Sequence, residues 1–205
     1  MPRLARGLQL PFTRTMRRKQ QQEGFTLIEL SVTVVIIGIL AVLATVGYGR
    51  MVRSSYTTEG TRMVNAIRIA QETVKAETGS YVNLGLATMC PQNVSAVDKD
   101  NAGKKWGWNP ACNSGSGAWS LLPVQTDGPV RYGYGTIANT TPGQAVAVSG
   151  FWDGEINGAA VTWPSPAPQN WYIIAAAGDM DGNGVNSYIV GSSFTNEVWI
   201  SNEGE

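Results

Sequence analysis

The sequence predicts an α+β fold, in which one long N-terminal helix packs on an antiparallel β-sheet formed by the C-terminal half. Three observations predict it. The run Phe25–Tyr48 is predominantly apolar and contains a single charged residue, a carboxylate. Apolar residues then recur at helical spacing up to residue 74. Beyond residue 130, short runs rich in Val, Ile, Tyr and Trp alternate with turn residues, as expected of β-strands.

The apolar run is long enough to cross a membrane, since about twenty apolar residues span a bilayer as a helix. A secretory signal peptide is the alternative, but the apolar region is too long and no small-residue cleavage site precedes a polar mature start. Six of the fifteen basic residues precede Gly24. This basic flank predicts that the rest of the chain faces outward.

Glu29 lies near the start of the apolar run and needs a partner there, because a carboxylate in hydrocarbon costs on the order of 3 kcal/mol. No lysine or arginine occurs between Phe25 and Gly49. A cut between Gly24 and Phe25 would instead expose an amine four residues from Glu29. Opposite charges about 4 Å apart attract by roughly 4 kcal/mol at an effective dielectric constant of 20. The pair could form within one chain or between neighbouring chains.

The residues GFTLIEL, from Gly24 to Leu30, followed by the apolar run with IGILA at Ile37–Ala41, resemble the N-terminus of type IV pilins and their pseudopilin relatives. The resemblance implies cleavage after Gly24 by prepilin peptidase and N-methylation of Phe25. It also implies that Glu29 neutralises a neighbouring N-terminus as subunits add to a fibre. The competing interpretation is a single-pass anchor with a chance glutamate.

Two features depart from that family's pattern. Many members have a proline, which bends the helix, at the position of Val46. A leader of 24 residues is also long for the commonest subfamily, and Met16 would give a basic leader of ordinary length, MRRKQQQEG. We therefore expect Met16 to be the true start. Without the proline, we expect the helix to be locally less stable near Gly38 or Gly47, because glycine lowers the stability of a helix interior by about 1 kcal/mol.

The function implied by the resemblance is a structural subunit of a type IV pilus for motility or adhesion, with a pilin-like fold. It would be a single-pass precursor in a bacterial inner membrane and then, with the pilus assembly machinery, a homo-oligomeric helical fibre on the cell surface. The first alternative is a pseudopilin of a type II secretion system. The second is a membrane-anchored carbohydrate-binding module that uses the tryptophans.

Charge and composition exclude other classes. Beyond residue 24 the chain contains nine basic and fourteen acidic residues. Its net charge there is mildly negative, which disfavours nucleic-acid binding. The chain has no histidine, and so lacks the usual general base and the commonest zinc ligand. Neither a nucleophile-elbow motif nor a phosphate-binding loop occurs. The sequence therefore predicts a protein that is not an enzyme.

Four segments follow from these patterns: a leader at 1–24, a membrane and assembly helix at 25–49, an amphipathic helix at 50–79 and a globular head at 80–205. The whole helix is expected from Phe25 to about Glu77, ending at Thr78-Gly79 because glycine suits the left-handed position past a helix end. Its second half carries an apolar stripe that should back the sheet: Val52, Tyr56, Met63, Ile67, Ala70 and Val74.

The head is expected to contain a long connecting region at 82–128 and then four to six antiparallel strands. The strand-like runs are Arg131–Ile137, Gln144–Ser149, Ala159–Trp163, Trp171–Ala177, Ser187–Gly191 and Glu197–Ile200. All seven tryptophans lie beyond residue 100 and are expected mainly in the core, although exposed ones could bind sugars or a partner subunit.

Cys90 and Cys112 are the only two cysteines, and both lie on the expected exported side. In an oxidising compartment such a pair predicts a disulfide, with two free buried thiols as the alternative. Closing a loop of this length would stabilise the fold by roughly 3 kcal/mol in the chain-entropy model.

The run GDMDGNG places Asp179, Asp181 and Asn183 at alternate positions before Gly184, as in the first half of an EF-hand loop. These oxygens, with the carbonyl of Val185, could bind Ca²⁺, and some pilins and pseudopilins bind calcium in this domain. The bidentate glutamate that would complete the loop is absent, because Val190 stands at its position, although Glu197 or Asp153 could fold in. The alternative is a plain hairpin turn, for which Asp-Gly and Asn-Gly are strong signals.

Overall fold

The structure is a computed structural model that describes residues 24–91, 103–113, 117–139, 141–146, 155–156, 159–160 and 162–203. Residues 1–23 of the leader expected at 1–24, which include the proposed start at Met16, lie outside these residues, as do Trp152 and Asp153. By its contacts the chain divides into two units between Leu43 and Ala44. The second unit contains the sheet and the part of the helix that packs on it.

Helix α1 runs from Leu27 to Thr78, close to the expected bounds. Thr26 caps its start, because its hydroxyl accepts the Glu29 amide at 3.3 Å and its carbonyl accepts the Leu30 amide at 3.2 Å. At the other end Gly79 adopts φ = 82° and donates its amide to the Lys75 carbonyl at 2.8 Å. This is the left-handed helix ending that the sequence predicts.

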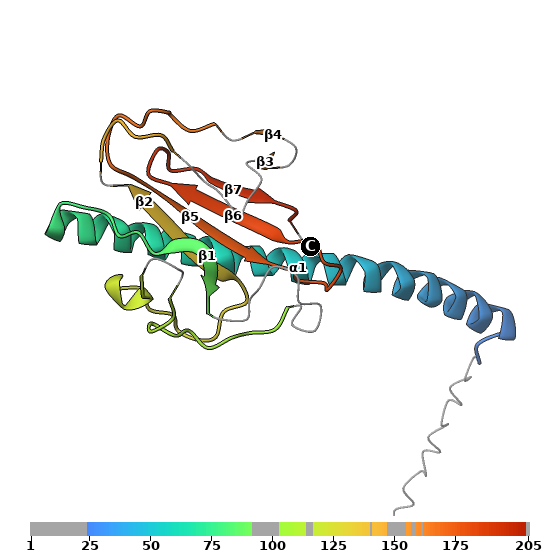
Figure 1. Cartoon of the computed structure of the whole chain (residues 1–205). Helices are drawn as coiled ribbons and strands as arrows, with labels where there is room; N and C mark the ends of the chain where they lie inside the picture. Colours follow the sequence, from blue (N-terminus) through green and yellow to red (C-terminus); the bar gives the residue numbers. More distant parts are fainter. Residues whose placement is uncertain are drawn as a thin grey trace, which may run out of the picture. The chain divides into compact units, whose positions relative to one another are not determined.

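The main sheet has five strands in the order β1-β2-β5-β6-β7, with every neighbouring pair antiparallel (Figure 1). This confirms the predicted α+β architecture of one long helix packed on an antiparallel sheet. The strand bounds are β1 Gly85–Cys90, β2 Gly133–Asn139, β5 Trp171–Gly178, β6 Ser187–Ser192 and β7 Val198–Ser201. A separate pair consists of β3 Glu155–Ile156 and β4 Ala159–Ala160.

Three details of the head differ from the sequence-based expectations. The segment 82–128 is not only a connection, since it contains β1 and the short 3-10 helix η2 Trp119–Leu121. The run Gln144–Ser149 was expected to be a strand, but its described part, 144–146, is irregular and 147–149 lie outside the described residues. In the run Ala159–Trp163 the described strand is Ala159–Ala160, whereas Thr162 and Trp163 are irregular and residue 161 lies outside the described residues.

Strand β5 lies in the middle of the sheet and is buried along its whole length, WYIIAAAG. Its side chains alternate between two clusters because successive residues of a strand point to opposite faces. Tyr172, Ile174 and Ala176 join the larger cluster, to which α1 contributes Ile67, and Trp171 and Ile173 join the smaller one.

The predicted apolar stripe of α1 is confirmed. Met63, Ile67 and Ala70 are buried, and Tyr56 and Val74 are partly buried against the same cluster. Figure 1 shows the second half of α1 running along the sheet. Gly60 permits this close approach, because a Cβ there would meet the side chains of Ile189 and Tyr132 in the sheet layer.

Gln71 supplies a polar link inside this otherwise apolar layer and is fully buried. Its side-chain amide donates to the Val82 carbonyl at 2.8 Å and to the Thr136 hydroxyl at 3.1 Å. Its carbonyl accepts the Val82 amide at 2.9 Å. The side chain therefore has partners for both its donors and its acceptor, which is the condition under which a buried amide is tolerated.

Candidate functional site

The first unit presents an apolar helical surface with no cover from its own chain. Every described side chain from Gly24 to Thr45 is exposed, including Phe25 (82%), Leu27 (86%) and Ile28 (72%). The mean hydropathy reaches 2.7 in this stretch, and α1 is the one described helix long and apolar enough to cross a membrane. Such a surface is stable only in lipid or against other chains, since burying apolar area is worth about 25 cal/mol per Å².

Glu29 lies in the first turn of α1 and is exposed. A carboxylate there interacts favourably with the positive end of the helix dipole, by about 0.3–1 kcal/mol. Gly24 and Phe25 precede the helix and are also exposed, so the Gly24–Phe25 peptide bond lies outside regular structure. The single carboxylate and the expected cleavage bond thus lie together at the start of the apolar segment.

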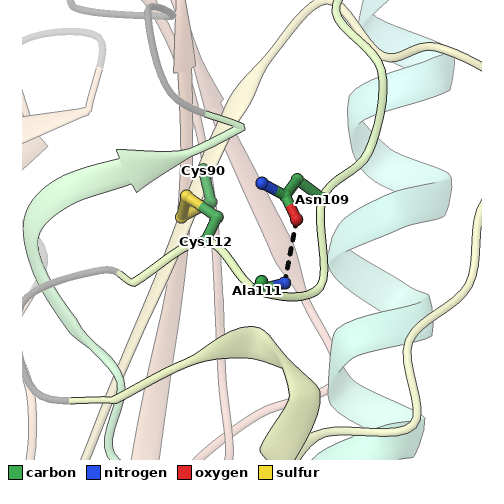
Figure 2. Close-up of a disulfide and its surroundings, with 4 residues drawn as sticks. All are labelled: Cys90, Asn109, Ala111 and Cys112. Carbon is green, nitrogen blue, oxygen red and sulfur yellow. Dashed lines mark hydrogen bonds between the residues drawn. A yellow bond between two sulfur atoms is a disulfide. The ribbon is translucent and has the colours of Figure 1, made fainter.

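The predicted disulfide between Cys90 and Cys112 is confirmed (Figure 2). It joins the last residue of the edge strand β1 to a turn in which the Asn109 side-chain oxygen accepts the Ala111 amide at 3.0 Å. Both cysteines are buried. The bond therefore fixes the connecting segment 103–113 to the edge of the sheet.

The loop between β5 and β6 holds the three residues that were predicted to bind calcium. Asp179 is buried, and its carboxylate accepts the main-chain amides of Asp181 (3.2 Å), Gly182 (2.7 Å) and Gly184 (2.8 Å). Asp181 in turn accepts the Asn183 amide at 3.0 Å. The side-chain oxygens that could bind a cation are therefore all engaged in closing the turn.

The surroundings of this loop bear on the calcium prediction. The Asp179 carbonyl accepts the amide of Gly103 at 3.1 Å, which brings a segment with two lysines, Lys104 and Lys105, against the loop. Among the residues that the structure describes, no group of three or more Asp, Glu, His or Cys side chains is placed to hold a metal ion. Calcium binding through Asp179, Asp181, Asn183 and Val185 stays a prediction.

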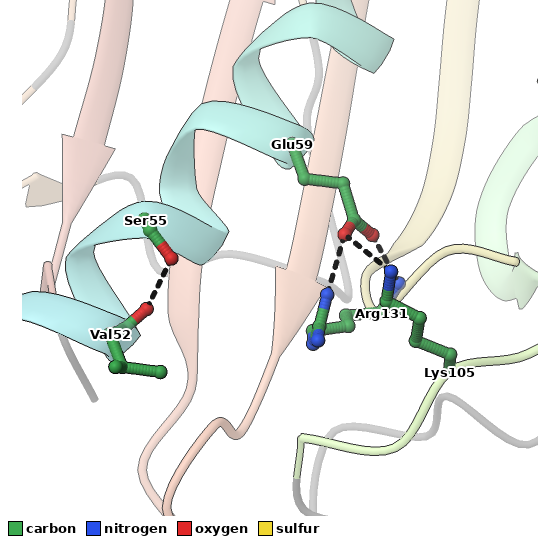
Figure 3. A network of polar contacts seen from close by, with 5 residues as sticks. All are labelled: Val52, Ser55, Glu59, Lys105 and Arg131. Carbon is green, nitrogen blue, oxygen red and sulfur yellow. Dashed lines mark hydrogen bonds and ion pairs between the residues drawn. The ribbon is translucent and has the colours of Figure 1, made fainter. Parts of the chain in front are cut away.

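An ion pair that the sequence patterns did not indicate ties α1 to the head (Figure 3). The Glu59 carboxylate accepts the main-chain amide of Arg131 and its guanidinium, both at 2.7 Å, and lies 3.9 Å from the Lys105 ammonium. The Arg131 guanidinium carbon lies 3.9 Å from the centroid of the Tyr56 ring. Glu59 and Arg131 are 72 residues apart, so no local pattern could pair them.

A groove of about 670 Å³ runs beside this ion pair between α1 and the segment 125–130. It is open and of mixed character, with the residues Ser55, Glu59, Arg62, Met63, Lys105 and Asp127 among those that line it. The described side chains around it include no histidine, no cysteine and no cluster of three carboxylates.

Several buried tyrosines of the head have raised pKa values and are held neutral. Burial raises the pKa of Tyr134 well above its ordinary value, and it also raises the pKa of Tyr172. Burial also raises the pKa of Tyr81. Its hydroxyl accepts a hydrogen bond from the Lys75 ammonium at 2.8 Å and donates one to the Glu72 carboxylate at 2.9 Å. These tyrosines belong to the larger hydrophobic cluster and do not line the groove beside Glu59.

The described tryptophans divide between the core and partly exposed positions. Trp119 and Trp171 are buried, whereas the others described are half-buried. Trp163 packs edge-on against Trp199 at 5.1 Å between ring centroids, next to Phe194 at 5.8 Å. Packing of this kind, within the smaller hydrophobic cluster, accounts for these rings without a sugar ligand.

Comparison with known proteins identifies the N-terminal segment. The family model for the prokaryotic N-terminal methylation motif, the signal of type IV pilins and pseudopilins, matches residues 19–45. This match contains the bond after Gly24, the residue Phe25 and the carboxylate of Glu29. A comparison with curated proteins and one with solved structures each found no match.

Proposed function

We propose that this chain is the structural subunit of a type IV pilus. The N-terminal methylation motif supports a pilin or pseudopilin that prepilin peptidase processes at the membrane. The observation that carries the proposal is the uncovered apolar helix that begins directly after the cleavage bond and contains one carboxylate, Glu29. In a fibre, the helices of neighbouring copies would cover these side chains.

Glu29 is the residue through which the proposal is tested. In the fibre it neutralises the methylated amine of Phe25, on its own chain or on a neighbour. Its replacement makes membrane insertion cheaper by up to about 3 kcal/mol. It leaves a buried amine without a counter-charge, and breaking a buried pair costs roughly 3–5 kcal/mol. We therefore expect Glu29→Gln to give a processed, membrane-inserted subunit that assembles poorly.

The assay measures subunits in the membrane and in sheared surface fibres, for wild type, Glu29→Gln and the matched control Ser31→Ala. Ser31 lies in the same helical turn and, among the described residues, its hydroxyl donates to the Ile28 carbonyl alone, at 2.8 Å, so its replacement should leave assembly unchanged. Normal fibres from Glu29→Gln would contradict the proposed role. N-terminal mass spectrometry of the fibres should find methylated Phe25, and an intact Gly24–Phe25 bond would contradict the processing step.

A pseudopilin of a type II secretion system is the second candidate, since the methylation motif is common to both. The head disulfide favours the pilus, because secretion pseudopilins tend to lack it. Shearing of the wild-type cells separates the two: a pilus subunit appears in the surface fraction, whereas a pseudopilin does not. A subunit found only in the membrane fraction would favour the pseudopilin.

For the loop Asp179–Gly184 we propose calcium as a weak ligand, with a dissociation constant on the order of 10⁻⁴ M. Three oxygen-bearing side chains in one turn support it, although binding would compete with the hydrogen bonds that close the turn. At 1 mM calcium this affinity would stabilise the fold by about 1.4 kcal/mol through mass action. Thermal unfolding with calcium and with chelator tests it, and an equal shift in Asp181→Ala would contradict it.

A further inference from the structure

The loop between β5 and β6 contains the dipeptide Asn183–Gly184, in which a side-chain amide is followed by a residue without a Cβ. Asn183 is exposed, and Gly184 adopts φ = 89°. In such a pair the glycine main-chain nitrogen can attack the asparagine side-chain carbonyl carbon, because no side chain hinders its approach. Exposure lets ammonia leave and water enter.

Three hydrogen bonds place polar groups at the atoms that this reaction changes. The Val185 amide donates to Asn183 Oδ1 at 2.6 Å, where negative charge develops during attack. Gly184 N donates to Asp179 Oδ2 at 2.8 Å, so a carboxylate oxygen lies at the proton that must leave. Asn183 Nδ2, the leaving nitrogen, donates to Asp181 Oδ2 at 3.3 Å.

We propose that Asn183–Gly184 is a site of self-modification through a succinimide. The Gly184 nitrogen forms a bond to Asn183 Cγ, and its proton passes to Asp179 Oδ2. The Cγ–Nδ2 bond breaks, and the side-chain nitrogen takes up that proton and departs as ammonia. Water then opens the ring at either carbonyl and leaves aspartate or isoaspartate at position 183. No oxidant, reductant or cofactor takes part.

The product changes both the charge and the connectivity of the loop. A third carboxylate joins Asp179 and Asp181, so the head gains one negative charge. When the ring opens to isoaspartate, one extra methylene enters the main chain before Gly184. The amide of Gly184 then moves relative to Asp179, and the hydrogen bond that closes the turn is lost. An irreversible change of this kind would mark the age of a subunit.

The experiment follows each Asn-Gly bond of the mature full-length chain in detergent at mildly alkaline pH, by peptide mass spectrometry with fragmentation that distinguishes isoaspartate. The same chain unfolded in denaturant gives the intrinsic rate. Asn157–Gly158, which lies outside the described residues, is an internal reference for buffer and temperature. Asp127→Ala is the control, because it removes an exposed carboxylate elsewhere in the head without creating a further Asn-Gly pair.

We expect the rate at Asn183 in the folded chain to exceed the unfolded rate at least about tenfold, since a positioned general base contributes roughly 10²–10⁴-fold. Asp179→Asn should remove this excess, and Asp127→Ala should retain it. If Asp179→Asn fails to fold, Asp181→Ala provides the second variant and should lower the folded rate. A folded rate at or below the unfolded rate would overturn the proposal, as would full acceleration in both loop variants.

Discussion

Replacing Glu59 by glutamine removes the charge of the residue that ties α1 to the start of β2, while the shape of the side chain is kept. The carboxylate accepts two hydrogen bonds of 2.7 Å from Arg131. After the change, the guanidinium retains its contact with the Tyr56 ring but loses its only carboxylate within 4 Å among the described residues. Its side chain is only 18% exposed, so solvent replaces the lost partner poorly.

The expected loss of folding free energy in Glu59→Gln follows from this partial burial. A fully exposed pair would contribute about 0.2–1 kcal/mol, and breaking a fully buried one would cost about 3–5 kcal/mol. Hydrogen bonds to charged groups contribute about 1.5–3 kcal/mol. With the two side chains 26% and 18% exposed, we expect Glu59→Gln to cost about 2 kcal/mol. For a head of this size, that lowers Tm by about 4–8 °C.

Thermal unfolding of the mature chain in detergent measures this loss by near-UV circular dichroism, which reports on the tryptophans of the head. Lys105→Ala is the matched control, because Lys105 lies 3.9 Å from the same carboxylate and is 47% exposed. It should change the free energy of unfolding by less than about 0.5 kcal/mol. A double-mutant cycle of Glu59→Gln with Arg131→Gln should show a coupling of at least about 1 kcal/mol. Equal Tm values for wild type and Glu59→Gln would refute the reasoning.

Three further changes test the packing of the head. Gly60→Ala should cost about 1–3 kcal/mol through overpacking, whereas Gly47→Ala, where a Cβ meets nothing within 4 Å, should be neutral or stabilising; equal Tm shifts in thermal melts would contradict this. Replacing Cys90 and Cys112 by serine should cost about 2–4 kcal/mol in denaturant unfolding, and non-reducing peptide mapping of wild type should find them bonded. Stability should fall as pH rises above about 10, because the unfolded chain then ionises Tyr134 while the folded state holds it neutral; a flat pH profile there would contradict the raised pKa.

The helix and the central strand could be predicted because their signals are local. The helix α1 has a sustained apolar period and a terminal glycine, and β5 is a continuous apolar run that begins with two aromatic residues and two isoleucines and is bounded by turn residues. The cysteines could be paired because the chain has only two. By contrast, β1 escaped prediction because GLATMC contains Gly, Ala and Met, and its register with β2 shifts between Gly85 and Cys90.

The polar contacts of the head could not be predicted, since they join residues far apart in sequence. Helical spacing places Glu59 on the line of the apolar stripe, between Tyr56 and Met63, but does not indicate Arg131, 72 residues later. Gln71 falls next to Ala70 on the stripe, where an apolar residue would be expected. Its burial depends on the Thr136 hydroxyl of β2. At Asp179 the sequence supplies the oxygens but cannot indicate that main-chain amides occupy them.

The division between Leu43 and Ala44 has a consequence for how mutations combine. Glu29 belongs to the unit whose side chains are uncovered, whereas Glu59 belongs to the unit that contains the sheet. Because the two share no partner among the described residues and are thirty residues apart in sequence, their free-energy effects should add within about 0.5 kcal/mol. Glu29→Gln should then reduce fibre yield at unchanged Tm, and Glu59→Gln should lower Tm without altering membrane insertion. A double variant whose Tm falls below that of Glu59→Gln alone would show that the two units are energetically coupled.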